Sequence, residues 1–540
     1  MASDPSERPQ DVVWDAIVVG TGMGGGTLGA ALARAGWRVL FVERGRSSLY
    51  ASDDCIRDAL PDDRPDVLKL PEREYVELLA RGGRSTDLVE DISGQKPPTF
   101  TPFIGSGTGG STALYGMALE RLFASDFAPR ADHPAAEGAN LPEHWPIDYE
   151  TLRPWYVAAE RLYRVHGSPD PLRPGDADAP LIESPPLTPT NGELFAHLQN
   201  KGLHPYQLHI GCEHLPDCQN CQGYLCSRDC KSDAGNRCLR PAIEQHGAGL
   251  LTSCTATRLE AEGTAVRRLV CRRGDEEIVL RGRYVVLAAG ALVTPILLLN
   301  SRSAEFPQGL ANSSDQVGRN LMRHCIDMLM VQMNAKEPVR GQIKELAFND
   351  FYHLGGQKLG TFQSFGPLPP IAYFLNQGTG WWLRLLRPLL VYFGEQLKSK
   401  GLVVTTIMED LPYAEHRVLP SATTFDGLRQ RIQLNYRLQT YELDRLATFR
   451  KAVENVLKPY KLVQLRGASE NRAIAHVCGT CRFGDDPRTS VFDKHCRAHD
   501  LDNLYVADAS FFPSSGGINP SLTIAANALR VAAHLVDRGR

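Results

Sequence analysis

The feature of the sequence that most constrains the fold is a glycine-rich motif near the N-terminus. The residues Gly20-Thr-Gly22-Met-Gly-Gly25 fit the pattern G-x-G-x-x-G, and they follow a short apolar, β-branched run at 14–19. In such a motif the first glycine permits a tight turn, the second lets the backbone approach a pyrophosphate, and the third lets helix and strand pack closely. A helical segment and a second apolar run follow, at 27–35 and 38–42. This order predicts a β-α-β unit that binds a dinucleotide, with the phosphates at the helix N-terminus.

An acidic residue stands where such a unit contacts the ribose of its cofactor. Glu43 lies 23 residues beyond Gly20, at the end of the second predicted strand. A carboxylate there accepts hydrogen bonds from the ribose hydroxyls and disfavours a 2′-phosphate. We expect Glu43, and Arg44 beside it, to bind the cofactor. The motif alone does not distinguish FAD from NAD.

Length and charge narrow the class of protein. The chain has 540 residues, so two or more domains are expected. Its 59 basic and 62 acidic side chains give a formal net charge of -3, which offers no attraction for nucleic acid or an anionic membrane. The first ten residues are polar, and no apolar run has the pattern of a secretory signal or the length of a spanning helix. We therefore expect a cytoplasmic protein without nucleic-acid or membrane partners.

The rest of the chain predicts a second, different sheet. Residues 265–289 alternate like a hairpin that turns at Arg273–Gly274, and proline-dense residues 128–190 suit loops and short helices. Further predicted elements are strands of a separate antiparallel sheet at 325–334, 402–408 and 430–437, and helices at 441–458 and 522–536. The two ends of the chain are therefore expected to form one domain, with the middle inserted as another.

Several motifs together resemble the glucose-methanol-choline (GMC) oxidoreductase family. The C-terminal ones are His476-Val-Cys-Gly-Thr-Cys-Arg-Phe-Gly484, Asn503-Leu-Tyr-Val-Ala-Asp508 and Pro513-Ser-Ser-Gly-Gly-Ile-Asn519-Pro520. Earlier ones are Gly109-Gly110-Ser111-Thr112, Gly290-Ala-Leu-Val-Thr294-Pro295 and Val317-Gly-Arg-Asn-Leu321. The resemblance spans nearly the whole chain.

The resemblance implies an α/β Rossmann-type FAD-binding domain and an α+β substrate domain with an antiparallel sheet. We expect the FAD-binding domain to comprise residues 1–180, 210–320 and 470–540, and the substrate-binding domain to comprise 181–209 and 321–469. By position, we expect Glu43 to contact the adenosine ribose of FAD and Ala256 to lie near adenine. Near the pyrophosphate and flavin we expect Gly109, Gly110 and Ser111. At the ribityl chain and the flavin ring we expect Asp508, Asn519 and Pro520.

The early signature departs from the family pattern at two positions. Tyr115 stands where the family usually has Asn or His, and Ser106 where Arg is common. Members with covalent flavin often carry a histidine in this segment, and residues 103–120 contain none. We therefore expect FAD to be bound non-covalently.

The chemistry implied by the family is oxidation of a CH–OH group. Flavin N5 takes the hydride, and the protein supplies a base for the hydroxyl proton. The resemblance assigns the base to His476, whose ordinary pKa of about 6.5 suits proton transfer near neutral pH. It places Asn519 beside the base, where the amide can orient the alcohol and stabilise a developing alkoxide. His495, His499 and His534 are expected to be structural.

A cysteine-rich segment allows two interpretations. Cys218, Cys221, Cys226 and Cys230 are closely spaced, with Cys212 and Cys238 on either side. Four thiolates could bind an iron–sulfur cluster or zinc, and a few GMC dehydrogenases that resemble this stretch carry such a cluster. The alternative is structural thiols or a disulfide.

The apolar segment 368–394 also has several interpretations: a lid over the substrate, a subunit interface or a membrane-surface contact. The lid or interface is favoured because no polybasic sequence flanks the segment. The expected substrate is a small alcohol, with a sugar as the first choice, and the electron acceptor is O2 or another carrier. The competing functions are an FAD-containing GMC-type lyase, a dehydrogenase that passes electrons through an iron–sulfur cluster, and a plain NAD dehydrogenase, against which the C-terminal motifs argue.

Overall fold

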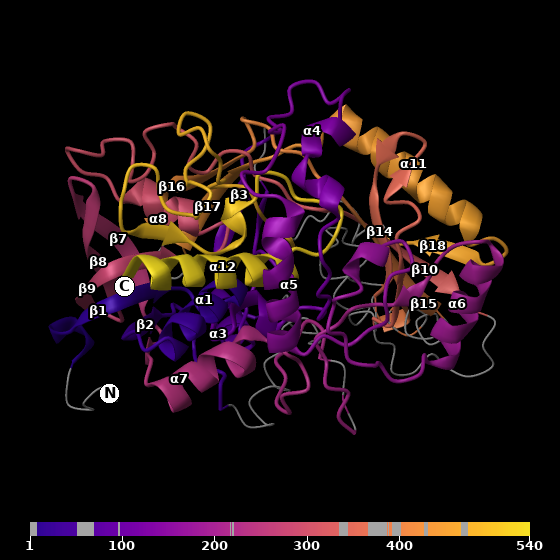
Figure 1. Ribbon diagram of the computed structural model, residues 1–540, viewed down its shortest axis with the longest axis horizontal. Coiled ribbons are helices and arrows are strands. Elements are labelled where there is room, and N and C mark those ends of the chain that lie inside the picture. Colours follow the sequence, from indigo (N-terminus) through magenta and orange to yellow (C-terminus); the bar gives the residue numbers. More distant parts are fainter. Residues whose placement is uncertain are drawn as a thin grey trace.

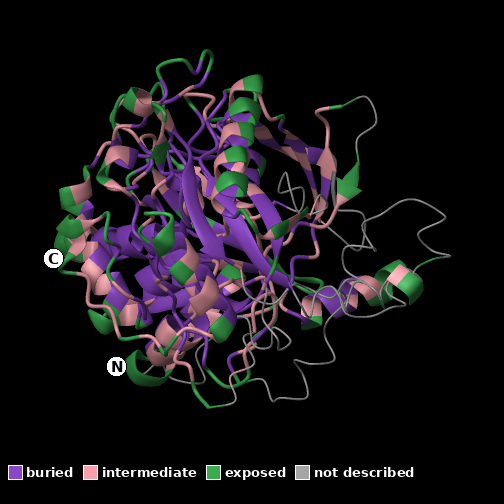
Figure 2. Cartoon of the chain, turned by 90° about the vertical axis from the view of Figure 1, so that its right-hand side faces the viewer, coloured by how far each residue is buried: buried purple, intermediate pink, exposed green. Residues whose placement is uncertain are grey.

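The fold contains two large β-sheets that lie on opposite sides of the molecule (Figure 1). The computed structural model describes residues 8–50, 70–94, 98–216, 218, 221–333, 344–365, 386, 388–390, 392, 401–425, 430–465 and 474–539. Buried residues fill the interior around the strands, and exposed residues lie on the outer helices and loops (Figure 2).

The first sheet has a parallel core. Its central strand β1 (Val13–Val19) pairs in parallel with β2 (Val39–Val42) and with β9 (Glu276–Leu287). Strand β6 (Gly249–Leu251) extends the parallel part beyond β2, and β19 (Leu504–Val506) pairs in parallel with β9. All four residues of β2 and the last four of β1 are buried, which is what continuous apolar runs predict for strands covered on both faces.

An antiparallel hairpin widens this sheet. Strand β8 (Ala265–Arg273) pairs with β9 and with β7 (Thr255–Glu262). The register joins Arg273 to Glu276, so the turn lies where the alternating pattern predicts it. The hairpin predicted over 265–289 is therefore confirmed.

Helices pack on the parallel strands and on one another. Helix α1 (Met23–Arg34) lies along α12 (Ser521–Gly539), and α5 (Tyr149–Tyr163) packs on α12 (Figure 1). Hydroxyl contacts fix this packing, because Tyr163 Oη lies 2.7 Å from Thr27 Oγ1 and Tyr156 Oη lies 2.8 Å from Thr523 Oγ1.

Helix α5 corrects the expectation of only loops and short helices in 128–190. It runs for 15 residues although it contains Pro154. The Asp148 side chain caps its start by accepting from the Thr151 N–H at 2.8 Å. Proline lies near the start of the helix, and burial of the face against α12 outweighs the lost hydrogen bond.

The second sheet is antiparallel and has the order β18-β10-β15-β14-β11-β5. Its strands are β5 (Tyr206–Gln207), β10 (Cys325–Gln332), β11 (Leu346–Phe348), β14 (Gly360–Ser364), β15 (Gly401–Met408) and β18 (Lys461–Gln464). Helices α6 (Pro189–Asn200) and α11 (Thr440–Val456) contribute apolar side chains to the core of this sheet. The predicted combination of a Rossmann-type sheet with an antiparallel substrate sheet is confirmed.

One predicted strand belongs to a different sheet. Strand β17 (Gln430–Asn435) pairs with β16 (Arg417–Phe425) and, in parallel, with β3 (Leu88–Asp91), which pairs with β4 (Thr99–Phe100). The expectation that 430–437 joins the strands at 325–334 and 402–408 was wrong. Alternation defines the buried face of a strand but not its partner, and here the parallel partner is β3, for which the sequence predicted no strand.

The remaining elements are short. They are α3 (Glu72–Arg81), α4 (Pro129–Asp132), α7 (Arg240–His246), α8 (Thr294–Asn300), β12 (His353–Leu354), β13 (Gln357–Lys358), the 3-10 turns Pro9–Asp11, Gly110–Ala113, Ala124–Phe127, Pro174–Asp176 and Ala509–Phe511, and a π-helical turn at Gly235–Leu239.

A buried ionic cluster supports the strand ends of the second sheet. Lys358 Nζ lies 2.6 Å from Asp126 Oδ1 and 2.7 Å from Glu409 Oε2, and His133 Nε2 contacts the same Glu409 oxygen at 2.8 Å. Burial alone would raise the pKa of Glu409, but Lys358 and His133 together hold it well below its ordinary value. Glu409 Oε1 also accepts the Gly516 N–H at 3.2 Å, which ties the cluster to the C-terminal segment.

We predict that Gly24→Ala destabilises the protein by about 3 kcal/mol or more. A Cβ at Gly24 would fall 1.8 Å from the Ala507 carbonyl oxygen, so helix α1 could not stay against the end of β19. Denaturant unfolding measures the loss. The matched control is Gly192→Ala in α6, where a Cβ meets no atom within 4 Å and should stabilise the helix by about 0.5–1 kcal/mol. Equal stabilities of Gly24→Ala and the wild type would contradict the prediction.

Candidate active site

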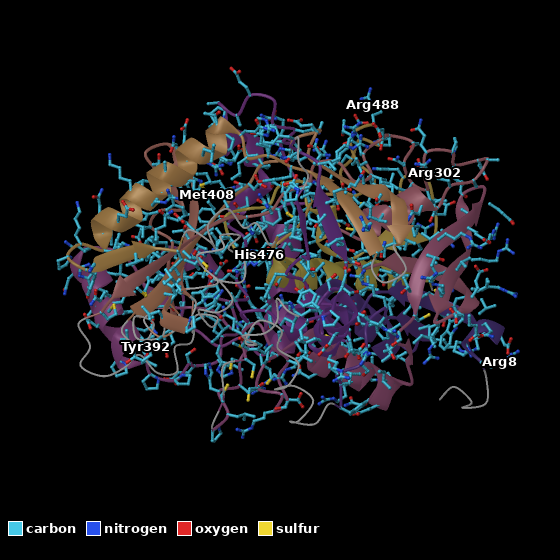
Figure 3. All side chains as sticks on the ribbon, turned by 180° about the vertical axis from the view of Figure 1, so that it is seen from behind. Arg8, Arg302, Tyr392, Met408, His476 and Arg488 are labelled. Carbon is cyan, nitrogen blue, oxygen red and sulfur yellow. The ribbon has the colours of Figure 1, made fainter. Side chains whose placement is uncertain are left out.

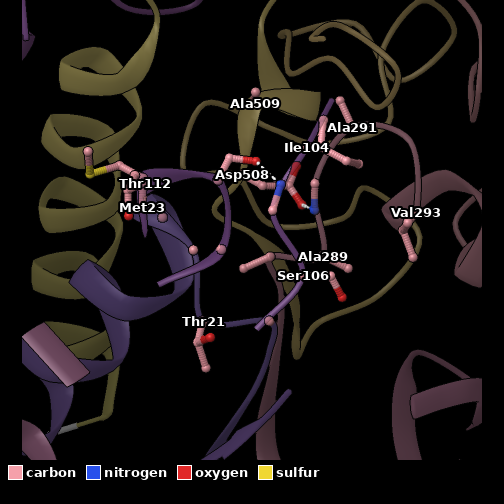
Figure 4. Close-up of a pocket in the computed structure, with 18 of the residues that line it drawn as sticks. Thr21, Met23, Ile104, Ser106, Thr112, Ala289, Ala291, Val293, Asp508 and Ala509 are labelled. Carbon is pink, nitrogen blue, oxygen red and sulfur yellow. Dashed lines mark hydrogen bonds between the residues drawn. The ribbon is translucent and has the colours of Figure 1, made fainter. Parts of the chain in front are cut away.

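A cavity opens at the carboxyl ends of the parallel strands. It is lined by the end of β1, the start of α1, the residues after β9 and the C-terminal segment that leads into α12 (Figure 4). Parallel sheets place ligand sites at this edge. Most predicted site residues line it: Gly20, Gly22, Glu43, Arg44, Gly110, Ser111, Ala256, His476, Asp508, Asn519 and Pro520.

The two remaining predicted glycines, Gly25 and Gly109, are outside that lining. A Cβ at Gly25 would lie 2.2 Å from the Gly20 carbonyl oxygen, so this glycine allows strand and helix to pack closely. Gly109 adopts a left-handed conformation with φ of 85° and begins the turn that carries Gly110 and Ser111 to the cavity. Both shape the backbone behind the site.

The glycine turn forms a cradle for phosphate. Among the residues that the structure describes, no side chain caps the start of α1 at Gly22, so the first N–H groups of the helix face the cavity region. A Cβ at Gly110 would lie 2.7 Å from Gly22 Cα, and one at Gly290 would meet no atom within 4 Å. Two glycine segments thus approach each other closely while a third borders open space. This arrangement fits a pyrophosphate.

Glu43 is held at the end of β2 by the glycine turn. Its Oε2 accepts the Thr21 hydroxyl at 2.7 Å and the Thr21 N–H at 3.2 Å, and its Oε1 accepts the Gly45 N–H at 2.9 Å. Each carboxylate oxygen can accept more than one hydrogen bond, so capacity remains for ribose hydroxyls. Arg44, in contrast, makes a two-pronged ion pair with Asp87, at 2.9 and 2.7 Å.

Asp508 holds together the segments that border another side of the cavity. Its Oδ2 accepts the Gly290 N–H at 2.8 Å and the Thr294 hydroxyl at 2.5 Å, and its Oδ1 accepts the Ser510 N–H at 2.8 Å (Figure 4). Burial raises the pKa of Asp508, and these hydrogen bonds oppose the rise. One carboxylate therefore joins the segments after β9 and β19.

His476 and Asn519 lie in the same cavity. His476 is near the centre of the molecule and adopts a left-handed backbone conformation with φ of 59° (Figure 3). Burial lowers the pKa of His476 well below its ordinary value, and the nearby His324 and Lys344 lower it further. The imidazole is therefore neutral at physiological pH and able to accept a proton.

The Asn519 amide has one end occupied. Gln363 Nε2, from strand β14, donates to Asn519 Oδ1 at 2.7 Å. The Nδ2 group of Asn519 is then the end that can donate to a substrate oxygen. This agrees with the donor role expected for Asn519 from the sequence.

Three residues near His476 and Asn519 were not identified from the sequence. Gln363 holds Asn519, His324 contacts His476 Nδ1 through its own Nδ1 at 3.0 Å, and Lys344 lines the cavity. Burial lowers the pKa of Lys344 to about 8. Gln363 and Lys344 lie in no motif, and His324 follows the Val317–Leu321 motif without belonging to it.

The structure locates the two residues, Ser106 and Tyr115, that depart from the family pattern. Ser106 and Tyr115 both line the cavity. The Tyr115 hydroxyl donates to the Ser232 carbonyl in a very short hydrogen bond, and burial raises its pKa well above the ordinary value. Tyr115 therefore acts as a fixed neutral wall of the cavity.

Of the two interpretations of the cysteine segment, the metal site finds no support among the described residues. In the parts of the chain that the structure describes, no three His, Cys, Asp or Glu side chains are arranged to hold a metal ion. The thiols contact one another in sequence: Cys212 with Cys218, Cys218 with Cys230, Cys230 with Cys226, and Cys226 with Cys221. Buried Lys231 donates to the carbonyls of Ala113, Cys221 and Tyr224, which fixes the segment by backbone contacts.

Residues 368–394 lie mostly outside the described residues. Of this segment, 386, 388–390 and 392 are described, and Leu386, Leu389 and Tyr392 are exposed. The lid, interface and membrane interpretations stay predictions. Within the described ranges, no helix has the length and apolar character needed to cross a bilayer.

Family models identify the class of protein that this fold and cavity define. Two models, both described as GMC oxidoreductase, match residues 15–326 and 421–528. The chain belongs to the GMC oxidoreductase family. It is an FAD-dependent oxidoreductase of the GMC type.

Individual relatives are similar over almost their whole length. The chain is 29% identical over 561 residues to paromamine 6'-oxidase of Streptomyces fradiae, covering 98% of this chain and 93% of the relative. It is 30% identical over 553 residues to 6'''-hydroxyparomomycin C oxidase of Streptomyces lividus, covering 97% and 92%. The crystal structure of pyridoxine 4-oxidase from Mesorbium loti has the same fold, with a TM-score of 0.65, 20% identity and coverage of 96% and 99%.

We predict that Cys226 is the thiol of this segment that alkylating reagents modify first. A hydrogen bond from Cys221 lowers the pKa of Cys226 despite burial, and the Lys231 ammonium adds to this, whereas the pKa values of Cys221 and Cys230 are raised. Limited iodoacetamide labelling near pH 6.5, followed by peptide mass spectrometry, measures the order. Cys226→Ser should remove the fast phase and Cys230→Ser should retain it. Uniform labelling of the segment would contradict the assignment.

Proposed function

We propose that this enzyme oxidises the CH–OH group of a small polyhydroxy alcohol, with His476 as the base. The observation that carries the proposal is that His476 and Asn519 share one cavity with the glycine cradle of the cofactor. FAD, when bound, supplies the two-electron acceptor at flavin N5. The residues of the chain supply binding, orientation and proton transfer.

The proposed proton transfer uses the neutral state of His476. At physiological pH the imidazole is unprotonated because burial, His324 and Lys344 all lower its pKa. It can therefore take the hydroxyl proton of the substrate directly. Asn519 Nδ2 donates to the same substrate oxygen and stabilises negative charge while the O–H bond breaks.

The proposed cofactor contacts follow the lining of the cavity. Glu43 would hold the adenosine ribose, Ala256 would lie near adenine, and Gly20, Gly22, Gly110 and Ser111 would border the pyrophosphate, with Gly109 shaping the backbone behind them. Asp508 and Pro520 would border the ribityl chain and flavin. We propose non-covalent FAD, since residues 103–120 contain no histidine.

The proposed domain division follows the two sheets. Residues 1–180, 210–320 and 470–540 would form the FAD-binding domain, and 181–209 with 321–469 the substrate-binding domain. The small sheet of β3, β4, β16 and β17 draws strands from both parts and would join them.

The proposed substrate class is a sugar or sugar-like alcohol. Lys344 and Asn519 present N–H donors to the cavity, which suit hydroxyl oxygens. The relatives include a fructose dehydrogenase large subunit and a 2-methyl-1,2-propanediol dehydrogenase, both named for hydroxyl-bearing substrates. Since named relatives include oxidases and dehydrogenases, the acceptor is proposed as O2 or another carrier.

We predict that His476→Ala keeps FAD but reduces it at least about 100-fold more slowly with substrate, the loss expected for a missing general base. Stopped-flow absorbance under anaerobic conditions measures the rate. His499→Ala is the matched control, because His499 Nε2 contacts Ser490 Oγ at 2.9 Å and does not line the cavity. An unchanged rate in His476→Ala would overturn the assignment of the base.

A second prediction separates oxidation from lyase chemistry. Candidate sugars, amino sugars and simple alcohols are added anaerobically to the FAD-loaded enzyme, and the visible flavin absorbance is recorded. Bleaching by a hydroxyl substrate is expected. Turnover of a cyanohydrin with an unchanged spectrum would instead support the lyase. Parallel oxygen-electrode and dye-reduction assays then identify the acceptor.

A further inference from the structure

A second histidine lies against the proposed base. His324, which directly precedes strand β10, places its Nδ1 3.0 Å from Nδ1 of His476, and the two rings are perpendicular. Both nitrogens belong to aromatic rings that can either donate or accept at that atom. A hydrogen bond between them therefore requires that one carries a proton and the other does not.

The contacts of the other ring nitrogen of His324, Nε2, show which of the two Nδ1 atoms carries the proton. His324 Nε2 lies 2.9 Å from the Gly516 carbonyl oxygen and 3.2 Å from the Ser515 carbonyl oxygen. Carbonyl oxygens only accept hydrogen bonds, so Nε2 of His324 must carry a proton. Burial lowers the pKa of His324 to about 4, so the ring is neutral and holds that single proton. Nδ1 of His324 is then an acceptor.

This protonation pattern determines the tautomer of His476. Because Nδ1 of His324 can only accept, Nδ1 of His476 must donate. We propose that His324 is a positioning residue that holds His476 as the Nδ1–H tautomer and leaves the lone pair on Nε2 as the base. The inference rests on the proposed function of His476 and extends it to the atom that receives the proton.

The contact also prepares the site for the charge that follows. Once Nε2 has taken the substrate proton, His476 is a cation whose Nδ1–H still donates to His324. His324 in turn donates to the Gly516 carbonyl, so the negative ends of two backbone dipoles face the pair from behind. The Gly516 N–H is itself fixed by Glu409, and Lys358 and His133 hold Glu409 in place.

The charged groups that shift the pKa values of the two histidines belong to few residues. His324 and Lys344 lower the pKa of His476, and Glu409 is the one carboxylate that raises the pKa of His324. Burial outweighs Glu409, so His324 stays neutral. A neutral acceptor orients the base without making an ion pair with it, in contrast to a carboxylate at the same place.

Direct observation of the tautomer tests the proposal. Protein labelled with 15N-histidine and loaded with FAD is examined by NMR, because protonated and bare imidazole nitrogens have well-separated 15N shifts. The His476 signals are assigned by their loss in His476→Ala. We expect protonated Nδ1 and bare Nε2 in the wild type. A protonated Nε2 on His476 would overturn the proposal, whatever the activity of the variants.

Substitutions at His324 separate positioning from a purely structural role. His324→Leu should keep FAD, mix the His476 tautomers and slow flavin reduction by about 10-fold or more, the range expected when an orienting partner is lost. His324→Asn offers an amide oxygen close to the Nδ1 position and should restore a large part of the rate and the Nδ1–H tautomer.

The matched control is His416→Leu. His416 is equally buried and its pKa is also lowered to about 4 by burial, but its ring packs against Tyr413 and Tyr436 and not against His476. It should lower thermal stability comparably while leaving the tautomer and the rate within about 2-fold. An unaltered tautomer and rate in His324→Leu would contradict the proposal. A third outcome is the expected tautomer together with normal flavin reduction in His476→Ala. That outcome would overturn the proposed function but would leave the assignment of the proton to Nδ1 intact.

Discussion

The constraint on which the structure depends is the close approach of backbones around the glycine turn after β1. Gly24 lies against the Ala507 carbonyl at the end of β19, Gly25 against Gly20, and Gly110 against Gly22. These contacts exclude any side chain and bring three distant parts of the chain to one edge of the parallel sheet. Asp508 then joins the segments after β9 and β19 with three hydrogen bonds. The cavity exists because these backbones meet there.

The second sheet completes the site from the opposite side. Asn519 and His476 come from the C-terminal segment, but the side chains that orient them, Gln363 and His324, come from β14 and from the residue before β10. The buried cluster of Lys358, Asp126 and Glu409 joins the same sheet to the Gly516 loop. Such a cluster adds little net stability compared with apolar packing, so its contribution here is the fixed position of a loop that borders the base.

The sequence predicted what local patterns determine. The β-α-β unit, the hairpin and the strands at 325–334 and 402–408 follow from apolar periodicity, and the motif residues follow from the family resemblance. Strand 430–437 was assigned to the wrong sheet because alternation does not specify a partner. Helix α5 was missed because Pro154 argues against a helix that tertiary packing stabilises. Gln363 and Lys344 could not be predicted, since their roles arise only where two sheets meet. The cysteine spacing left a metal site and structural thiols open, and among the described residues no side chains are arranged to hold a metal ion, while the thiols contact one another.

The charges around the proposed base explain how His476 could accept a proton although a lysine lies beside it. A lysine beside an imidazole opposes its protonation, so Lys344 keeps His476 neutral before the reaction. The same lysine, whose pKa is about 8, favours negative charge on a substrate oxygen, as does the Asn519 amide. In the proposed reaction Lys344 would make the substrate hydroxyl a stronger acid, while it makes the imidazole a weaker base. The carbonyls behind His324 offset the second effect, because they stabilise the cation that forms on His476. In the proposed mechanism, proton transfer would therefore depend on a balance between Lys344 and His324, which lie just before strands of the second sheet, and His476 of the C-terminal segment.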